Sequence, residues 1–186
     1  DFRSLDEFNG LWDVQLQIGG QEGPLYFKGS ILGGFPRELQ VALIDIPNRN
    51  VIEDFSQGRL EIDTKINSPY DIKIIAGERS YVVQMIEEIL ADIPEKYSLS
   101  QNYPNPFNPI TNINYSVPHS GSVTLSIYNI MGQRVTTLVS GTMKYGYHSV
   151  VWNGLDQSGR QVSSGVYFSE LSARGFRQTK KMLLLK

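Results

Sequence analysis

The chain contains no cysteine and only two histidines, which limits the chemistry open to it. Without cysteine there can be no disulfide, no thiolate nucleophile and no cysteine-ligated zinc, so burial and backbone pairing must supply its stability. No Gly-x-Ser-x-Gly turn, phosphate-binding glycine loop or metal-spaced His-Glu motif accompanies His119 and His148. We therefore expect a protein that is not an enzyme and that uses neither a cofactor nor a metal.

Long hydrophobic runs are also absent. The longest, such as Met182 to Leu185, fall far short of the ~20 residues that cross a bilayer as a helix, so we expect no membrane-spanning segment. The N-terminus lacks the basic, apolar and small-residue regions of a signal peptide. Because residue 1 is Asp rather than Met, we expect a processed product or a piece of a larger precursor.

Acidic residues are scarce in the second half of the chain. Residues 1–97 hold nine Lys or Arg against seventeen Asp or Glu, a net charge of −8, whereas residues 98–186 hold eight against two, a net charge of +6. Two interpretations stay open. Each half could steer an oppositely charged surface, such as a neighbouring copy, an anionic glycolipid or the other half of the chain, or two modules of separate ancestry could simply differ in charge.

The pattern that is present is a period-two alternation of β-branched and aromatic residues with polar ones, interrupted by turn residues, which is typical of an all-β protein. In the first half we expect strands over residues 12–18, 25–31, 39–46, 59–65, 70–76 and 81–86. The segment 83–90 also has apolar residues at helical spacing, but we favour a strand that ends near Glu87. In the second half we expect strands over residues 97–101, 113–117, 123–127, 134–139, 147–152, 166–171 and 178–185.

These elements predict two tandem antiparallel β-sandwiches, the second immunoglobulin-like with about seven strands. We expect an accessory sandwich over residues 1–92, a proline-rich connector over 93–109, and an immunoglobulin-like domain over 110–186 with its edge strand beginning near residue 97. Four prolines stiffen the connector because each fixes φ and lacks an N–H donor. Within it, we expect Tyr103 and Phe107 to pack against one edge of the second sandwich.

Individual residues of the second half have structural roles that the pattern suggests. Residues 129–132 and 156–159 fit turns, the second opened by Asp156 and closed by Gly159. A single carboxylate is a poor calcium site, so we expect no metal at Asp156. Trp152 is expected to fill the core between the two sheets.

The second half carries five ordered motifs over about 85 residues: Tyr-Pro-Asn-Pro-Phe-Asn-Pro at 103–109, Ile-Tyr-Asn-Ile-Met-Gly-Gln at 127–133, Gly-Tyr-His-Ser-Val-Val-Trp-Asn-Gly-Leu-Asp at 146–156, Ser-Ser-Gly-Val-Tyr-Phe at 163–168 and Lys-Lys-Met-Leu-Leu-Leu-Lys at 180–186. In these it closely resembles the C-terminal sorting domains (type A) of the type IX secretion system and the related immunoglobulin-like module of flagellar hook-capping proteins. The residues that carry the resemblance, all with structural roles, are Tyr103, Pro104, Asn105, Pro106, Phe107, Asn108, Pro109, Gly132, Trp152, Gly154, Asp156, Gly159, Gly165 and Tyr167.

The resemblance implies that the last domain is an address, read by the outer-membrane type IX translocon of a Gram-negative bacterium. It implies a secreted or cell-surface protein, and in many family members the domain is removed and the cargo is attached to anionic lipopolysaccharide. The basic residues that could be read are Arg174, Arg177, Lys180, Lys181 and Lys186. A structural alternative, compatible with this one, is that the lysines guard an edge strand against aggregation.

The first half resembles, more weakly, the β-sandwich modules that precede such domains in secreted proteins, through residues 41–46 and 70–77, which implies a non-catalytic accessory domain. Two other functions stay open. Self-association of oppositely charged domains could build a filament, tube or surface layer. A carbohydrate-binding module could stack sugars on Trp12, Tyr26, Phe27, Phe35 and Tyr70. We expect no nucleic-acid binding, because the basic half has no groove-reading or base-stacking motif.

Overall fold

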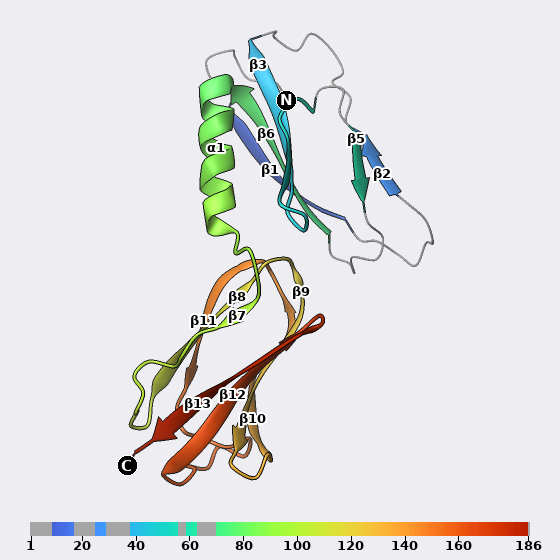
Figure 1. The fold of residues 1–186 in the computed structure, drawn as a ribbon. Coiled ribbons are helices and arrows are strands. Elements are labelled where there is room, and N and C mark those ends of the chain that lie inside the picture. The colour runs from blue at the N-terminus through green and yellow to red at the C-terminus, as the bar shows by residue number, and fades with distance from the viewer. Residues whose placement is uncertain (1–8, 17–24, 29–37, 56–58, 63–69, 186) are drawn as a thin grey trace. The chain divides into compact units, whose positions relative to one another are not determined.

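The computed structural model describes residues 9–16, 25–28, 38–55, 59–62 and 70–185, and Figure 1 shows their ribbon. The chain divides into two compact units, Asp1–Ile93 and Pro94–Lys186. The described residues contain thirteen strands and one helix, joined by turns and loops. Every ladder between strands is antiparallel. The prediction of an all-β protein is confirmed.

The first unit is built on a four-stranded sheet with the order β1-β6-β3-β4. Its strands are β1 (Gly10–Leu16), β3 (Leu39–Asp45), β4 (Asn50–Ile52) and β6 (Tyr70–Glu78), and a separate pair joins β2 (Leu25–Lys28) to β5 (Arg59–Ile62). On one face of the four-stranded sheet, Leu43, Phe55, Tyr70 and Ile72 form a buried apolar cluster.

A helix, α1 (Arg79–Asp92), occupies the segment in which we predicted a strand over residues 81–86, so that prediction is wrong. The helix packs against β6 and β3. It buries Val82 and Ile89, two helical turns apart, and leaves Glu87 exposed. The short apolar run at 81–83 fits both the two-residue period of a strand and the 3.6-residue period of a helix. Packing of one side of the helix on the sheet favours the helix.

A charged side chain from the sheet region closes the C-terminal end of α1. The guanidinium of Arg49 donates to the carbonyl oxygen of Leu90 at 3.2 Å and also to that of Ile93. The last carbonyls of a helix have no partner within the helix, and the cation also suits the negative end of the helix dipole. Arg49 therefore ties the turn after β3 to the end of the unit.

The second unit contains seven strands in two sheets, as expected for an immunoglobulin-like sandwich (Figure 1). The first sheet has the order β10-β9-β12-β13, and the second has the order β11-β8-β7. The strands are β7 (Ser98–Leu99), β8 (Thr111–Val117), β9 (Gly121–Asn129), β10 (Arg134–Met143), β11 (Gly146–Trp152), β12 (Gly165–Ala173) and β13 (Phe176–Leu184).

The core of the second unit lies between its sheets and is centred on aromatic rings. Trp152 is 1% exposed, and its ring centroid lies 5.4 Å from that of Phe107 and 5.2 Å from that of Tyr167. The indole N–H donates to the Leu155 carbonyl at 3.0 Å, so the one polar atom of the ring is satisfied. The prediction that Trp152 is a core residue is confirmed.

The two predicted turns are also confirmed. In the first, the Asn129 side chain accepts backbone hydrogen bonds from Met131 and Gln133, each at 3.0 Å, and Gly132 takes a φ of 74°. In the second, Asp156 accepts backbone hydrogen bonds from Ser158 at 2.8 Å and Arg160 at 3.0 Å. Both turns use a short polar side chain to satisfy backbone N–H groups that no strand reaches.

Candidate functional site

The last strand, β13, is the edge strand of its sheet and pairs in the ladder with β12 from Ala173↔Phe176 to Gly165↔Leu184. Met182 and Leu184 point into the core and are buried. On the other parity, Arg177, Thr179 and Lys181 are exposed and Leu183 is half-buried. One side of the strand therefore packs in the core, and a partner can reach the other side.

The free edge of β13 is covered by residues 101–107, which we call the strap. The backbone of Phe107 pairs with β13 on both sides: its N–H donates to the Leu183 carbonyl at 3.0 Å, and its carbonyl accepts from the Leu185 N–H at 2.9 Å. The Asn105 side chain accepts from the Leu183 N–H at 2.9 Å, and Gln101 Nε2 donates to the Lys181 carbonyl at 2.7 Å. The strap thus serves as a partial strand for an edge that would otherwise be open.

The strap is held on its other side by β8, in the second sheet. Tyr103 and Asn112 exchange two backbone hydrogen bonds of 2.9 Å. The buried side chain of Asn102 donates to the Thr111 hydroxyl at 2.9 Å and to the Pro104 carbonyl at 3.0 Å, and the Thr111 hydroxyl donates to the same carbonyl. The strap consequently joins β13 of the first sheet to β8 of the second and is hydrogen-bonded along its length.

The two aromatic residues of the strap do not behave alike. Phe107 is 2% exposed and packs on Trp152, as predicted. Tyr103 is 79% exposed, so the prediction that it packs against the sandwich is wrong. Its bridge partner Asn112 is on the outer side of β8, and directly opposed residues of an antiparallel pair share a face.

The remaining motif residues lie where turns and the core require them. Pro104, Pro106 and Asn108 are exposed, Pro109 is half-buried, Tyr167 is in the core, and Gly132, Gly154, Gly159 and Gly165 all have positive φ. At Gly154 an added Cβ would lie 3.4 Å from the Cβ and carbonyl oxygen of Pro109. This is a close approach between a loop and the end of the strap, where a side chain would strain the backbone as well.

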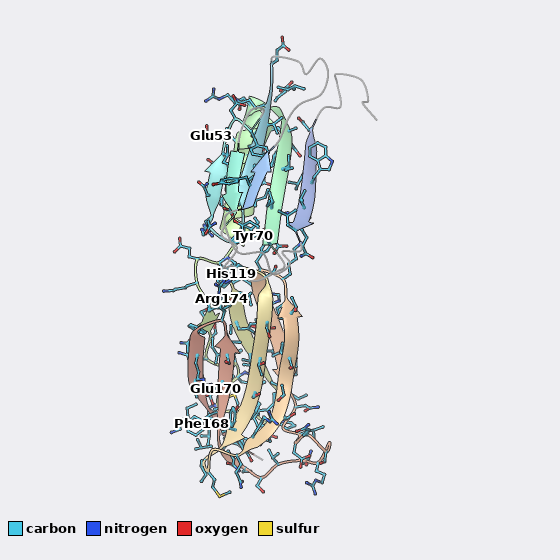
Figure 2. The ribbon with its side chains drawn as sticks, turned by 90° about the vertical axis from the view of Figure 1, so that its right-hand side faces the viewer. Glu53, Tyr70, His119, Phe168, Glu170 and Arg174 are labelled. Atoms are coloured by element: carbon cyan, nitrogen blue, oxygen red, sulfur yellow. The ribbon has the colours of Figure 1, made fainter. Side chains whose placement is uncertain are left out.

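The five basic residues proposed for recognition do not share one surface. Arg177 and Lys181 lie on the outer side of β13, whereas Lys180 is half-buried on the opposite parity. Arg174 lies in the turn before β13, and Figure 2 shows it beside His119, toward the other end of the unit from Phe168. Lys186 lies outside the described residues. Only Arg177 and Lys181 therefore share an exposed strand face among those described.

The outer side of β13 carries little opposing charge. Arg177 lies 3.8 Å from the carboxylate of Glu170 on β12, with the arginine side chain 72% exposed. Lys181 is directly opposite Phe168 on β12. A contact of this length from an exposed arginine is weak, and Lys181 is exposed, so both cations can be reached by an anionic partner.

At the end of the unit that carries Arg174, aromatic side chains enclose a histidine. The Tyr97 hydroxyl and His119 Nε2 form a hydrogen bond of 3.2 Å, and the Tyr97 ring stacks on Phe176 with centroids 5.5 Å apart. Burial lowers the pKa of His119, and the positive charge of Arg174 lowers it further. Burial raises the pKa of the Tyr97 hydroxyl, while Arg174 opposes part of that rise. The imidazole is thereby favoured in its neutral form.

Two exposed apolar residues were missed by the sequence analysis. Ile130 and Met131, at the tip of the β9–β10 turn, are 73% and 72% exposed. By register, this turn lies at the same end of the sheet as the end of β13, because Asn129 pairs with Tyr167 and Leu184 with Gly165. The sequence feature that could have identified them is an apolar pair inside a turn, where polar residues are usual.

Of the aromatic residues considered for sugar stacking in the first unit, the structure describes the side chains of Trp12, Tyr26 and Tyr70. Tyr70 is fully buried and donates its hydroxyl to Asp45 Oδ1 at 2.9 Å, so its proposed role in stacking is wrong. Trp12 on β1 and Tyr26 on β2 are about half exposed, at 52% and 48%. The side chain of Phe27 and all of Phe35 lie outside the described residues.

Neither a metal cluster nor a membrane helix occurs among the described residues. No group of three or more His, Asp or Glu side chains there could hold a metal ion. Within the same ranges, α1 is the one helix, and it is neither long nor apolar enough to cross a membrane.

Comparison with solved structures finds several partial likenesses at low identity. PorZ, described as an essential bacterial surface component of the type-IX secretion system of Porphyromonas gingivalis, is 15% identical over 61% of this chain and 14% of its own, with a TM-score of 0.34. FlgD from P. aeruginosa is 20% identical over 49% of this chain and 73% of its own, with a TM-score of 0.34. Dimeric latent PorU from Porphyromonas gingivalis is 10% identical over 97% of this chain and 21% of its own, with a TM-score of 0.38.

This chain therefore spans only a small part of PorZ and of PorU. No curated protein matches it. Among known families, the FlgD Ig-like domain matches residues 111–175, which run from the start of β8 to the turn before β13. The match lies wholly within the immunoglobulin-like sandwich, and the resemblance to the module of hook-capping proteins is confirmed. Residues 111–175 of the second unit are therefore similar to the FlgD Ig-like domain.

Proposed function

We propose that the second unit is a C-terminal sorting domain that directs a secreted protein across the outer membrane by the type IX secretion system and delivers it to the cell surface of a Gram-negative bacterium. The FlgD Ig-like domain at 111–175 supports the fold that such a domain needs. One observation carries the proposal further. The strap and the closing basic motif at 180–186, which lie far apart in the sequence, are hydrogen-bonded to each other. They form one continuous surface that a receptor could read.

In this proposal the mechanism is recognition without chemistry, and the first unit is a non-catalytic accessory domain. The strap occupies the edge of β13 along residues 181–185, so a receptor cannot add a strand there unless the strap leaves. The receptor therefore reads side chains, of which Arg177 and Lys181 are the exposed cations on β13 among the described residues. The net charge of +6 over residues 98–186 also favours binding to anionic lipopolysaccharide after export.

The test compares export of two matched variants of the whole precursor in its own cell. Deletion of β13 is unsuitable because it would remove the buried residues Met182 and Leu184. Arg177→Gln with Lys181→Gln instead removes two exposed charges and leaves the core intact. We expect this variant to accumulate in the periplasm, measured by immunoblotting of periplasmic and surface fractions.

The matched control is Arg134→Gln with Lys144→Gln, which removes two exposed charges from β10 and the turn that follows it. Normal export of the control and periplasmic retention of the first variant would support recognition of Arg177 and Lys181 by the translocon. Equal export of both would contradict the assigned residues. Export of a folded protein from which the whole second unit has been removed would contradict the sorting function itself.

A second candidate is a structural subunit of an extracellular filament, tube or surface layer, which the charge split between residues 1–97 and 98–186 favours. Such a protein would keep its last domain at the cell surface and would assemble through charge. Intact mass of the surface protein and light scattering at low and high salt distinguish the two. Loss of the second unit supports sorting, whereas a retained Lys186 in an assembly that dissociates in salt supports the structural subunit.

A further inference from the structure

The outer face of the three-stranded sheet β11-β8-β7 carries an unusual set of side chains for an exposed surface. The register places Tyr103, Asn112 and Val151 in one row across the sheet, Asn114 and Ser149 in the next, and Ser98, Ser116 and Tyr147 in a third. We call these eight residues the Tyr-Asn face. They come from three separate segments that only the fold brings side by side.

The largest members of this face project into solvent. Tyr103 is 79% exposed, Tyr147 is 70% exposed and Val151 is 52% exposed. Asn112 and Asn114 lie between them and are exposed. Among the described residues, neither asparagine side chain has a hydrogen-bond partner, so both amides keep their full donor and acceptor capacity. Ser116, in contrast, is buried and bonded to Ser98 and to the Lys96 carbonyl.

We propose that the Tyr-Asn face binds a short, neutral oligosaccharide. Sugars present apolar C–H patches and hydroxyl groups side by side. A tyrosine ring offers a flat apolar surface for the former, and an asparagine amide both donates to and accepts from the latter. The face contains no charged residue, although residues 98–186 carry a net charge of +6, so its chemistry fits an uncharged ligand.

The size of the face also favours a small ligand over a protein. Its rows span two interstrand spacings, about 10 Å, and its length along β8 from residue 112 to residue 116 is about 14 Å. That footprint of about 140 Å² is far below the ~800 Å² that each partner of a stable protein interface buries. Tyr103 and Tyr147 stand at opposite corners, about 17 Å apart along the diagonal, so one extended glycan could contact both.

The backbone that carries the two tyrosines is fixed before any ligand arrives. Tyr103 is held by its two backbone hydrogen bonds to Asn112, and Tyr147 lies within the β8–β11 ladder opposite Ser116. Because no backbone segment has to become ordered on binding, that cost is not subtracted from the affinity. This inference does not rest on the proposed sorting function, because of the eight residues only Tyr103 belongs to the strap, and the cations proposed for export, Arg177 and Lys181, are not among them.

The test is a titration of the full isotope-labelled chain with cellohexaose, maltohexaose, mannohexaose and xylohexaose, followed by two-dimensional amide NMR. We expect at least one of these sugars to shift the side-chain amide signals of Asn112 and Asn114. Tyr103→Ala and Tyr147→Ala should each weaken that binding by about tenfold, as loss of one stacking contact does. Tyr103→Phe should keep most of it, and Met131→Ala, at an equally exposed site, should change nothing.

Four results would overturn the inference. The first is no shift with any of the four sugars, and the second is binding that survives both alanine substitutions unchanged. The third is a set of shifts at Trp12 and Tyr26, which would place sugar binding in the first unit. Shifts of Asn112 and Asn114 that depend on protein concentration without sugar would instead assign the face to a second copy of the chain.

Discussion

Asn105 Oδ1 accepts a hydrogen bond of 2.9 Å from the backbone N–H of Leu183, a residue 78 positions later in the chain. The asparagine side chain supplies the acceptor that a neighbouring strand would normally offer to β13. Phe107 continues the same role with its backbone. The strap and β13 thus stabilise each other, and a change in the strap should be measurable in β13.

Replacing Asn105 by Ala should loosen the last strand. The Leu183 N–H would lose its acceptor, and a lost hydrogen bond of this kind costs about 1 kcal/mol. We expect a decrease of that size in the free energy of unfolding of the second unit, together with faster hydrogen exchange of the Leu183 amide. Urea unfolding and exchange measured by NMR provide the two readouts.

Asn108→Ala is the matched control, since Asn108 is an exposed asparagine of the same motif and has no hydrogen bond through its side chain among the described residues. Its unfolding and the exchange at Leu183 should be unchanged. An equal effect of the two substitutions would show that the motif acts through chain stiffness and that the bond to Leu183 contributes little.

Trp152→Ala should be the most damaging single change in the second unit. It removes the ring that contacts both Phe107 and Tyr167 and leaves a cavity in the core, for which about 3–5 kcal/mol is typical. Tyr147→Ala, five residues earlier on the exposed side of the same strand, should cost about 1 kcal/mol or less. Urea unfolding followed by far-ultraviolet circular dichroism measures both, and similar losses would argue against a core centred on Trp152.

His119 should titrate below its ordinary pKa of 6.5, because burial and the charge of Arg174 both disfavour the imidazolium. Its pKa is then lower in the folded than in the unfolded chain, so the unfolded state binds more protons as the pH falls. Stability should be highest above pH 6.5, should decline as the pH falls through 6.5 toward the folded-state pKa, and should level off below it. Unfolding at a series of pH values tests the sign.

Two variants control that pH experiment. His119→Gln should lack the decline that begins near pH 6.5, because the group that titrates is gone. Arg174→Gln should raise the pKa of His119 in an NMR titration, though burial should still keep it below the ordinary value. A pKa of His119 at or above 6.5 in the unaltered chain would refute the prediction.

Arg49→Ala should weaken α1 in the first unit. The substitution removes both donors to the Leu90 and Ile93 carbonyls, and hydrogen bonds from a charged group contribute about 1.5–3 kcal/mol. We expect that loss of stability and a smaller helical signal in circular dichroism. Arg79→Ala, an exposed arginine at the start of the same helix, is the control and should have little effect.

The double variant Arg177→Gln with Lys181→Gln should fold as stably as the unaltered chain, within about 0.5 kcal/mol. Both side chains are exposed, and the contact of Arg177 with Glu170 is long and open to water. Urea unfolding measures this directly. A large loss of stability would mean that a failure of export reflects misfolding, and the export test would then need single substitutions.

Strand positions in the second unit could be predicted from the sequence because alternation and turn chemistry are local signals. Ile113, Tyr115 and Val117 all point inward as their spacing predicted, and so do Val123, Leu125 and Ile127. The hydrogen-bonded turns at Asn129 and Asp156 followed from short polar side chains and glycine at fixed offsets. The first unit was harder, because residues 81–86 fit a strand while the overlapping segment 83–90 also fits a helix, and packing on β3 and β6 favours the helix.

The sequence alone determined the all-β class, the immunoglobulin-like sandwich, the turns and Trp152 as a core residue, since each depends on the spacing of residue types along a short segment. Only the tertiary structure decided that Tyr103 is exposed while Phe107 is buried, that the strap closes the edge of β13, and that the basic residues do not share one face. Those features depend on which distant segments become neighbours. Strand order and register set that, and no local pattern of residues specifies either one.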